Sequence, residues 1–208
     1  MVRKDFVNTY RNPMLLQLRI VTTIFMALYT SGLYYRFNGN YVDRTNWRSL
    51  TGYLFFISIS TMMMALNPMS LVFPKERDVF LKEEGAKLYS TSTYFLSRNI
   101  IEIPVAVIFP MIQALIVYWF VGLNSTVQQF FIFYLIAYLL AFNGASLGLM
   151  LGSMILDQKS VAVVTPIVLL PVILFSGFFK NTANLSMWAG WIQYISPIKY
   201  SFIAFVEN

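Results

Sequence analysis

The 208-residue chain contains no cysteine and no histidine. The missing cysteines exclude disulfides, thiolate metal sites and cysteine nucleophiles, and the missing histidines exclude imidazole ligands and histidine-based triads. Cysteine usage therefore gives no indication of the redox compartment. Charge is scarce too, because 15 Lys and Arg with 9 Asp and Glu make up only 12% of the chain. Typical soluble domains carry roughly 25% charged residues.

What the chain has instead is long uncharged hydrophobic sequence. Residues 49–74, 103–156 and 160–179 contain no formal charge, and 58% of the chain is hydrophobic. About 20 apolar residues in a helix cross the roughly 30 Å hydrocarbon core of a bilayer. The pattern predicts an all-α membrane protein, a polytopic helical bundle. Its five expected transmembrane helices cover 13–35, 49–71, 98–121, 127–156 and 159–179.

Both ends of the chain differ from these five segments. In residues 1–12, Val2, Phe6 and Tyr10 recur at helical spacing among charged residues, which predicts an amphipathic helix lying in the interface. Arg19 interrupts the apolar stretch that a signal peptide would need. Residues 180–208 are aromatic and rich in turn residues, which predicts an outer re-entrant or interfacial segment.

The distribution of Lys and Arg predicts a cytoplasmic N-terminus. With that orientation ten of the 15 basic residues lie inside and five outside, as the positive-inside rule requires. All four Trp residues then lie at or beyond the outer interface, and the two N-x-S/T triplets, at Asn124 and Asn184, lie outside. The net charge of +6 is thus distributed by membrane side and not in one patch, so no nucleic-acid partner is expected.

The densest charge lies in residues 75–87, which hold eight of the 24 charged residues. Pro74 suits a first helical position and Gly85 suits a helix end. Asp78–Lys82 and Glu83–Lys87 are favourable acid-before-base pairs four residues apart. The sequence therefore predicts a short helix inside a cytoplasmic loop over 73–97, followed by a Ser/Thr cluster that can cap the third span. The loop serves either to stay solvated or to dock a cytosolic partner.

Four strings carry a family resemblance. Three of them, in chain order, are GYLFFIS, ERDVFLKEEGAKLYSTSTYFLSRNIIEIP and FNGASLGLMLG. The fourth is FSGFFKN together with WIQYISPIKYSF near the end of the chain. The string that begins at Glu76 resembles the loop between the second and third spans of the White-type (G subfamily) ABC transporters. Its matching positions are Glu76, Arg77, Phe80, Glu83 or Glu84, Tyr89, Tyr94, Phe95 and Pro104. The others resemble the second span, the fourth span, and the fifth span with its outer cap.

The resemblance implies the membrane-spanning half of an ATP-driven exporter of lipophilic compounds (lipids, sterols or xenobiotics) that works by alternating access. In that family an ATP-binding domain precedes six spans, and two such halves form a homo- or heterodimer. This chain has no G-x-x-x-x-G-K-[ST] phosphate loop, so it is not itself expected to be an enzyme. ATP and Mg²⁺ would bind a missing ATP-binding domain. With about five of six spans present, the chain is expected to be an excerpt or a truncated gene model.

The resemblance also assigns roles to residues. The residues expected to contact the ATP-binding domain are Glu76, Arg77, Phe80, Glu83, Glu84 and Tyr89. The residues expected to line the substrate cavity are Phe55, Phe56, Ile59, Ser60, Met63, Leu170 and Ile173. Phe178 and Phe179 are expected to form an outer gate.

Several of these residues could instead have a purely structural role. The cavity residues could equally pack against lipid or a neighbouring helix. Gly144, Gly148 and Gly152 permit close helix packing, within the chain or in a dimer seam. Arg19 and Glu102 lie near the expected cytoplasmic ends of their spans, where they could snorkel, pair with each other or contact substrate.

Other functions compete with the exporter. An ion- or proton-coupled carrier or channel would need acidic residues near mid-bilayer, and none of the five expected spans has one at its centre. A stand-alone ABC-2 permease subunit is a further alternative. A membrane-embedded enzyme is disfavoured by the absence of His, Cys and paired intramembrane carboxylates. In each case the chain is a multi-pass protein of the plasma membrane or of an internal membrane.

Overall fold

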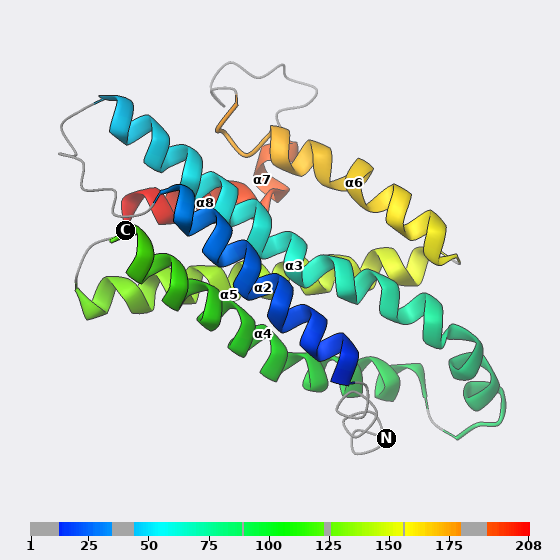
Figure 1. The fold of residues 1–208 in the computed structure, drawn as a ribbon. Coiled ribbons are helices and arrows are strands. Elements are labelled where there is room, and N and C mark those ends of the chain that lie inside the picture. The colour runs from blue at the N-terminus through cyan, green and yellow to red at the C-terminus, as the bar shows by residue number, and fades with distance from the viewer. Residues whose placement is uncertain (1–12, 35–43, 89, 123–125, 156, 180–190) are drawn as a thin grey trace.

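The computed structural model describes residues 13–34, 44–88, 90–122, 126–155, 157–179 and 191–208. Within these ranges the chain is helical and has no strands (Figure 1). The helices are α2 (Pro13–Leu33), α3 (Arg44–Gly85), α4 (Thr91–Val121), α5 (Val127–Met154), α6 (Gln158–Leu174), α7 (Ile192–Ile195) and α8 (Pro197–Glu207). The interfacial helix expected over 1–12 and the Asn124 and Asn184 triplets lie outside the described residues.

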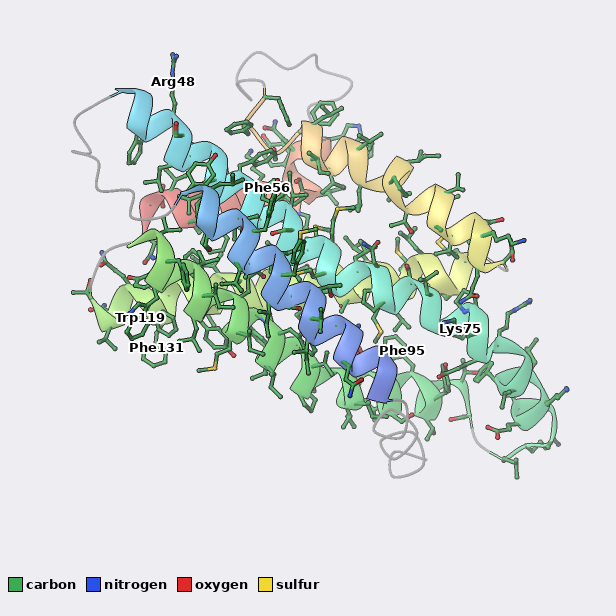
Figure 2. All side chains as sticks on the ribbon, viewed as in Figure 1. Arg48, Phe56, Lys75, Phe95, Trp119 and Phe131 are labelled. Carbon is green, nitrogen blue, oxygen red and sulfur yellow. The ribbon has the colours of Figure 1, made fainter. Side chains whose placement is uncertain are left out.

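Three of the helices are long and apolar enough to cross a membrane: Trp47–Arg77 within α3, Thr91–Val121 and Val127–Met154. Two further apolar helices, Arg19–Leu33 and Gln158–Leu174, are shorter. The outward surface is correspondingly apolar: Trp119 of α4 is 82% exposed and Phe131 of α5 is 57% exposed, and both project from the bundle (Figure 2). Aromatic rings exposed in this way are typical of a surface that faces lipid and not water. The protein is an integral, multi-pass membrane protein.

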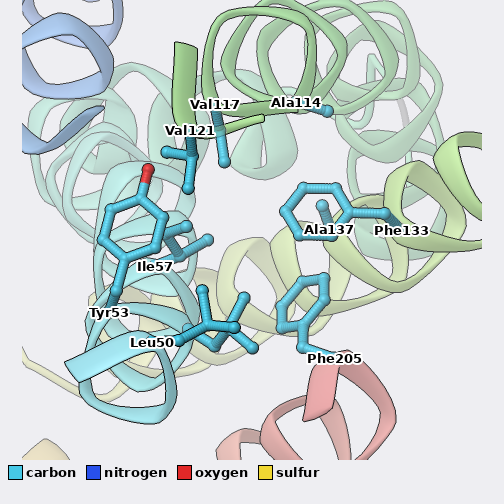
Figure 3. Packing of buried hydrophobic residues seen from close by; sticks show 10 residues of the cluster. Leu50, Tyr53, Ile57, Ala114, Val117, Val121, Phe133, Ala137 and Phe205 are labelled. Atoms are coloured by element: carbon cyan, nitrogen blue, oxygen red, sulfur yellow. The ribbon is translucent and has the colours of Figure 1, made fainter. Parts of the chain in front are cut away.

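Helix α3 is the centre of the bundle. It packs most extensively on α5 and also contacts α8, α6 and α4, whereas α2 packs mainly on α4. In Figure 1 α2 lies between α3 and α4, and α5 passes behind α2 and α3. The main core cluster joins four of these helices (Figure 3). Its buried members are Leu50, Tyr53, Leu54, Ile57, Ala114, Val117, Val121, Phe133, Ala137 and Phe205.

Helix α3 does not stop where the sequence predicted. The separate cytoplasmic helix expected to begin at Pro74 is the last part of α3, which contains both Pro68 and Pro74 in its interior. A proline inside a helix removes one backbone hydrogen bond, which a membrane helix tolerates when neighbouring groups satisfy the freed carbonyl. The expected end is confirmed, because α3 ends at Gly85. The left-handed residue that follows is Lys87, with φ 56°.

Helices α3 and α5 approach each other closely along the three glycines of α5. A Cβ atom on Gly144 or Gly152 would lie 2.6 Å from the carbonyl oxygen of Met62 or Ser70. Gly148 faces the carbonyl oxygen of Leu66 in the same way. Real Cβ atoms do not approach backbone oxygens this closely, so only glycine fits at these positions. The glycines pack within the chain, as the first of the two alternatives predicted.

The end of the chain is tied to the bundle by polar contacts. Ser196 is the N-cap of α8, where its Oγ accepts a hydrogen bond from the Lys199 backbone N–H (3.4 Å). The same Oγ donates to the Val172 carbonyl of α6 (2.8 Å). At the other end of α8, Asn208 Nδ2 donates to the Gln129 carbonyl of α5 (3.1 Å). Helix α8 is therefore held against both α5 and α6.

Candidate functional site

A cavity of about 410 Å³ lies between α2, α3, α4 and α5. Its wall on α3 includes Phe56, Ile59 and Met63, and its wall on α4 includes Phe109. The size falls within the roughly 300–1,000 Å³ of small-molecule sites, which are mostly apolar with a few polar groups. Aromatic and methionine side chains of this kind adapt to ligands of different shape.

One of the cavity's polar groups is an ion pair between α2 and α4. Arg19 Nη1 donates to Glu102 Oε1 at 3.1 Å, and the two side chains are 20% and 17% exposed. The Arg19 guanidinium carbon also lies 5.9 Å from the centre of the Phe109 ring. The pairing between Arg19 and Glu102 that the sequence allowed is confirmed, and it brings a charged couple into the cavity wall.

A second polar group lies on the α3–α4 side of the cavity, and its α4 member, Gln113, was missed by the sequence reasoning. Thr61 Oγ1 donates to Gln113 Oε1 at 3.0 Å, and Gln113 Nε2 donates to Ser60 Oγ at 3.3 Å. Ser60 Oγ in turn donates to the Ile57 carbonyl at 3.0 Å. A Gln inside the uncharged run of 103–156 was the available signal, since an amide in hydrocarbon needs partners.

The structure divides the seven residues expected to line a cavity. Phe56, Ile59, Ser60 and Met63 lie on the cavity wall. Phe55 is buried, with 4% of its surface exposed, in a second core cluster that Ile173 packs against. Leu170 is 55% exposed on α6. Successive helical residues point about 100° apart, so Phe55 and Phe56 could not both face one cavity.

The two residues expected to form an outer gate pack on Phe55. The Phe178 ring stacks on the Phe55 ring, with ring centres 4.4 Å apart and an interplanar angle of 11°. The Phe179 ring meets Phe55 edge-on at 5.5 Å, and Phe202 of α8 does the same. Gly177 supplies the positive φ (92°) that turns the chain into this pair. The result is a four-ring cluster that joins the segment after α6 to α3 and α8.

At the other end of α3, several of the residues expected to contact an ATP-binding domain face α4 instead of solvent. Tyr94 Oη donates to Glu76 Oε2 at 3.0 Å, and Thr91 Oγ1 donates to Glu84 Oε1 at 2.6 Å. Phe80 is buried with its ring 4.7 Å from that of Tyr94.

The outward surface of this end of α3 is basic and partly apolar. Lys75 and Lys82 are exposed, as is Val79, and Lys75 points away from the bundle (Figure 2). Arg77 and Glu83 are half-buried. Tyr89 and the Asp78 side chain lie outside the described part of the structure. The end of α3 therefore has one side fixed to α4 and one side open.

Comparison with known proteins decides the family. Residues 1–208 match the family described as ABC-2 type transporter. The chain belongs to the ABC-2 type transporters. It is a membrane domain of this family, related to the G-subfamily and White transporters, as the sequence motifs predicted.

Three relatives illustrate the relationship. ABC transporter G family member 2 of Dictyostelium discoideum is 31% identical over 194 residues, which are 92% of this chain and 14% of that protein. Protein white of Drosophila melanogaster is 26% identical, over 95% of this chain and 28% of its own length. The broad substrate specificity ATP-binding cassette transporter ABCG2 of Rattus norvegicus is 26% identical, over 99% and 31%. The chain thus spans less than a third of the length of each of these proteins.

Proposed function

We propose that this ABC-2 domain is the membrane-spanning half of an ATP-driven exporter, which moves lipophilic compounds by alternating access. The observation that carries the proposal is the mostly apolar cavity of about 410 Å³ in a domain of this family. Four residues picked from sequence for substrate binding, Phe56, Ile59, Ser60 and Met63, lie together on its wall. The cavity is the proposed substrate site.

The energy for transport would come from an ATP-binding domain, on the same chain or a separate one, that holds ATP and Mg²⁺. A second half-transporter, identical or different, would complete the assembly. We propose that the open side of α3 between Lys75 and Gly85 docks on that ATP-binding domain from the cytoplasm. Exposed Lys75 and Lys82 suit such a contact, because charged surfaces fix the register of a docking partner more than its affinity.

The continuity of α3 supports coupling between these two sites. Phe56, Ser60 and Met63 on the cavity wall and the docking surface belong to one helix, Arg44–Gly85. Contacts of Glu76 and Phe80 with Tyr94 tie the same end to α4, whose Phe109 and Gln113 form the opposite wall. A movement imposed on the docking end therefore acts on both walls. We assign the outer gate to the ring cluster of Phe178 and Phe179 on Phe55.

The test uses the full-length transporter in inside-out vesicles, with ATP-dependent uptake of a lipophilic dye as the readout. Met63→Trp fills part of the cavity and should strongly reduce uptake. The matched control is Met150→Trp, because Met150 lies on α5 with 47% of its surface exposed and outside the cavity lining. Equal uptake by both variants would exclude the cavity as the substrate site. Uptake that proceeds without ATP would favour an ion-coupled carrier.

A further inference from the structure

Arg19 places a cation in the wall of an otherwise mostly apolar cavity. Its ion pair with Glu102 uses a single guanidinium nitrogen, Nη1, which donates to one carboxylate oxygen at 3.1 Å. A guanidinium carries five N–H donors in a planar fork. A fully formed Arg–carboxylate pair uses two of them in parallel. The Arg19–Glu102 contact therefore leaves most of the donor capacity of Arg19 unused.

Arg19 lies on the cavity wall and keeps part of its side chain accessible, with 20% of it exposed. Among the described residues no buried side-chain nitrogen or oxygen lacks a hydrogen-bond partner, so the other Arg19 nitrogens must retain accessible surface. Arg19 is one of the residues that line the cavity, where a ligand can contact it. The Arg19 guanidinium also lies beside the Phe109 ring, so the charged group and an apolar part of the cavity wall are neighbours.

The neighbouring polar groups do not compete for the same ligand atoms. The hydroxyls of Thr23, Ser60 and Thr61 donate to protein oxygens, namely the carbonyls of Arg19 and Ile57 and the amide oxygen of Gln113. Their hydrogens are already used inside the protein. The uncharged donors left in the cavity are the side-chain amides of Asn67 and Gln113, and Arg19 is the one cation among the described lining residues.

We infer that Arg19 receives the anionic head group of an amphiphilic substrate, whose apolar tail lies along Phe56, Ile59 and Met63. The inference rests on the proposed function and narrows it from lipophilic compounds to amphiphilic anions. A carboxylate or sulfonate matches the free edge of the guanidinium fork with two parallel hydrogen bonds. Glu102 holds Arg19 in place when no ligand is bound. Its negative charge repels the anionic head group, so it lowers the affinity of the site for the ligand.

The experiment compares two probes that differ only in the head group, dodecanesulfonate and dodecanol. Binding to the full-length transporter in nanodiscs is measured after subtraction of binding to empty nanodiscs. The wild type should prefer the sulfonate by about tenfold, as expected for a charge-assisted hydrogen-bonded contact. Arg19→Gln should remove that preference, and Glu102→Gln should increase it because the repulsion is gone.

Folding is controlled with the neutral pair Arg19→Gln/Glu102→Gln, which leaves no charge unpaired. It should bind dodecanol like the wild type and show no preference for the sulfonate. Arg19→Lys should restore only part of the preference, because an ammonium group lacks the planar fork. Equal preference for the sulfonate in wild type and neutral pair overturns the inference.

The two proposals fail in different ways. If dodecanol binds and Met63→Trp abolishes that binding, the cavity assignment stands whatever the head-group preference. If dodecanol and dodecanesulfonate bind equally to the wild type, the anion site alone is overturned. If neither probe binds, or if Met63→Trp leaves the binding of both unchanged, the cavity is not a ligand site and both proposals are overturned.

Discussion

At the scale of single residues, the glycines of α5 set the strictest requirement in the fold. The carbonyl oxygens of Met62, Leu66 and Ser70 occupy the space that side chains at Gly144, Gly148 and Gly152 would need. Close approach through small residues is how membrane helices gain packing energy without a hydrophobic driving force between them. One face of α5 is thus determined by backbone atoms of α3.

Gly148→Ala should force α3 and α5 apart and destabilise the domain. We expect a cost of about 1–3 kcal/mol, the range for overpacking, seen as a lower melting temperature of the purified transporter. The matched control is Gly32→Ala on α2, where a Cβ meets nothing within 4 Å. That change should be neutral or stabilising, because alanine favours helix over glycine by about 1 kcal/mol. Equal melting temperatures for the two variants would contradict the packing.

At the scale of elements, the Gly85 end of α3 is held by an aromatic contact with the start of α4. Phe73, Phe80 and Tyr94 form a group of rings with centres 4.7–6.0 Å apart, next to the Tyr94–Glu76 hydrogen bond of 3.0 Å. Phe80 is buried in this contact, which ties this end of α3 to the start of α4.

Phe80→Ala should loosen this contact and uncouple transport from ATP hydrolysis. Removing a buried Phe side chain costs about 3–5 kcal/mol locally, so ATP-dependent uptake should fall severalfold while dye binding in the cavity persists. Val79→Ala is the control on the same helix turn, because Val79 is 55% exposed. Unchanged uptake in Phe80→Ala, with the protein still folded, would argue against coupling through this end.

The ring cluster of Phe178 and Phe179 on Phe55 allows a second test at this scale. Phe178→Ala removes the ring that stacks on Phe55, and the loss should open the proposed outer gate. We expect faster passive release of preloaded dye from proteoliposomes without ATP. The lipid-facing control is Phe131→Ala, since Phe131 is 57% exposed on α5. Matching release rates in the two variants would place the gate elsewhere.

At the scale of the whole molecule, the two ends of α3 allow a direct test of how the domain is oriented across the membrane. Arg48 and Lys75 are exposed and lie near opposite ends of the helix (Figure 2). The domain contains no native cysteine, so single cysteines introduced there carry the only thiol of this domain. The Lys and Arg distribution predicts that Arg48 lies outside and Lys75 in the cytoplasm.

In intact cells a membrane-impermeant maleimide should label Arg48→Cys and not Lys75→Cys, and permeabilisation should expose both. The measurement needs the full-length transporter with cysteines outside this domain replaced. Labelling of Lys75→Cys alone from outside would show the reverse orientation.

The features that the sequence could predict are those that depend on local composition or on a linear motif. The helices expected over 127–156 and 159–179 are found at Val127–Met154 and Gln158–Leu174. The stop at Gly85 and the Arg19–Glu102 pairing also belong here. The run of α3 through Pro74 could not be predicted, because a proline suits a helix start as well as a supported interior. The separation of Phe55 from Phe56 depends on how α3 is rotated about its axis. That rotation is set by packing against α5 and α8.

The 42 residues of α3 have a consequence for the mechanics of transport. At 1.5 Å per residue they extend about 63 Å, roughly twice the 30 Å hydrocarbon thickness. If the helix tilted by about 5° about its Arg44 end, its Gly85 end would move by about 5 Å, and the cavity wall nearer the pivot would move proportionally less. A displacement of the Gly85 end would thus become a smaller change in cavity width. Pro68 lies on the cavity wall and Pro74 lies between the cavity and Gly85, so bending of the helix at Pro74 would reduce the movement that reaches the cavity.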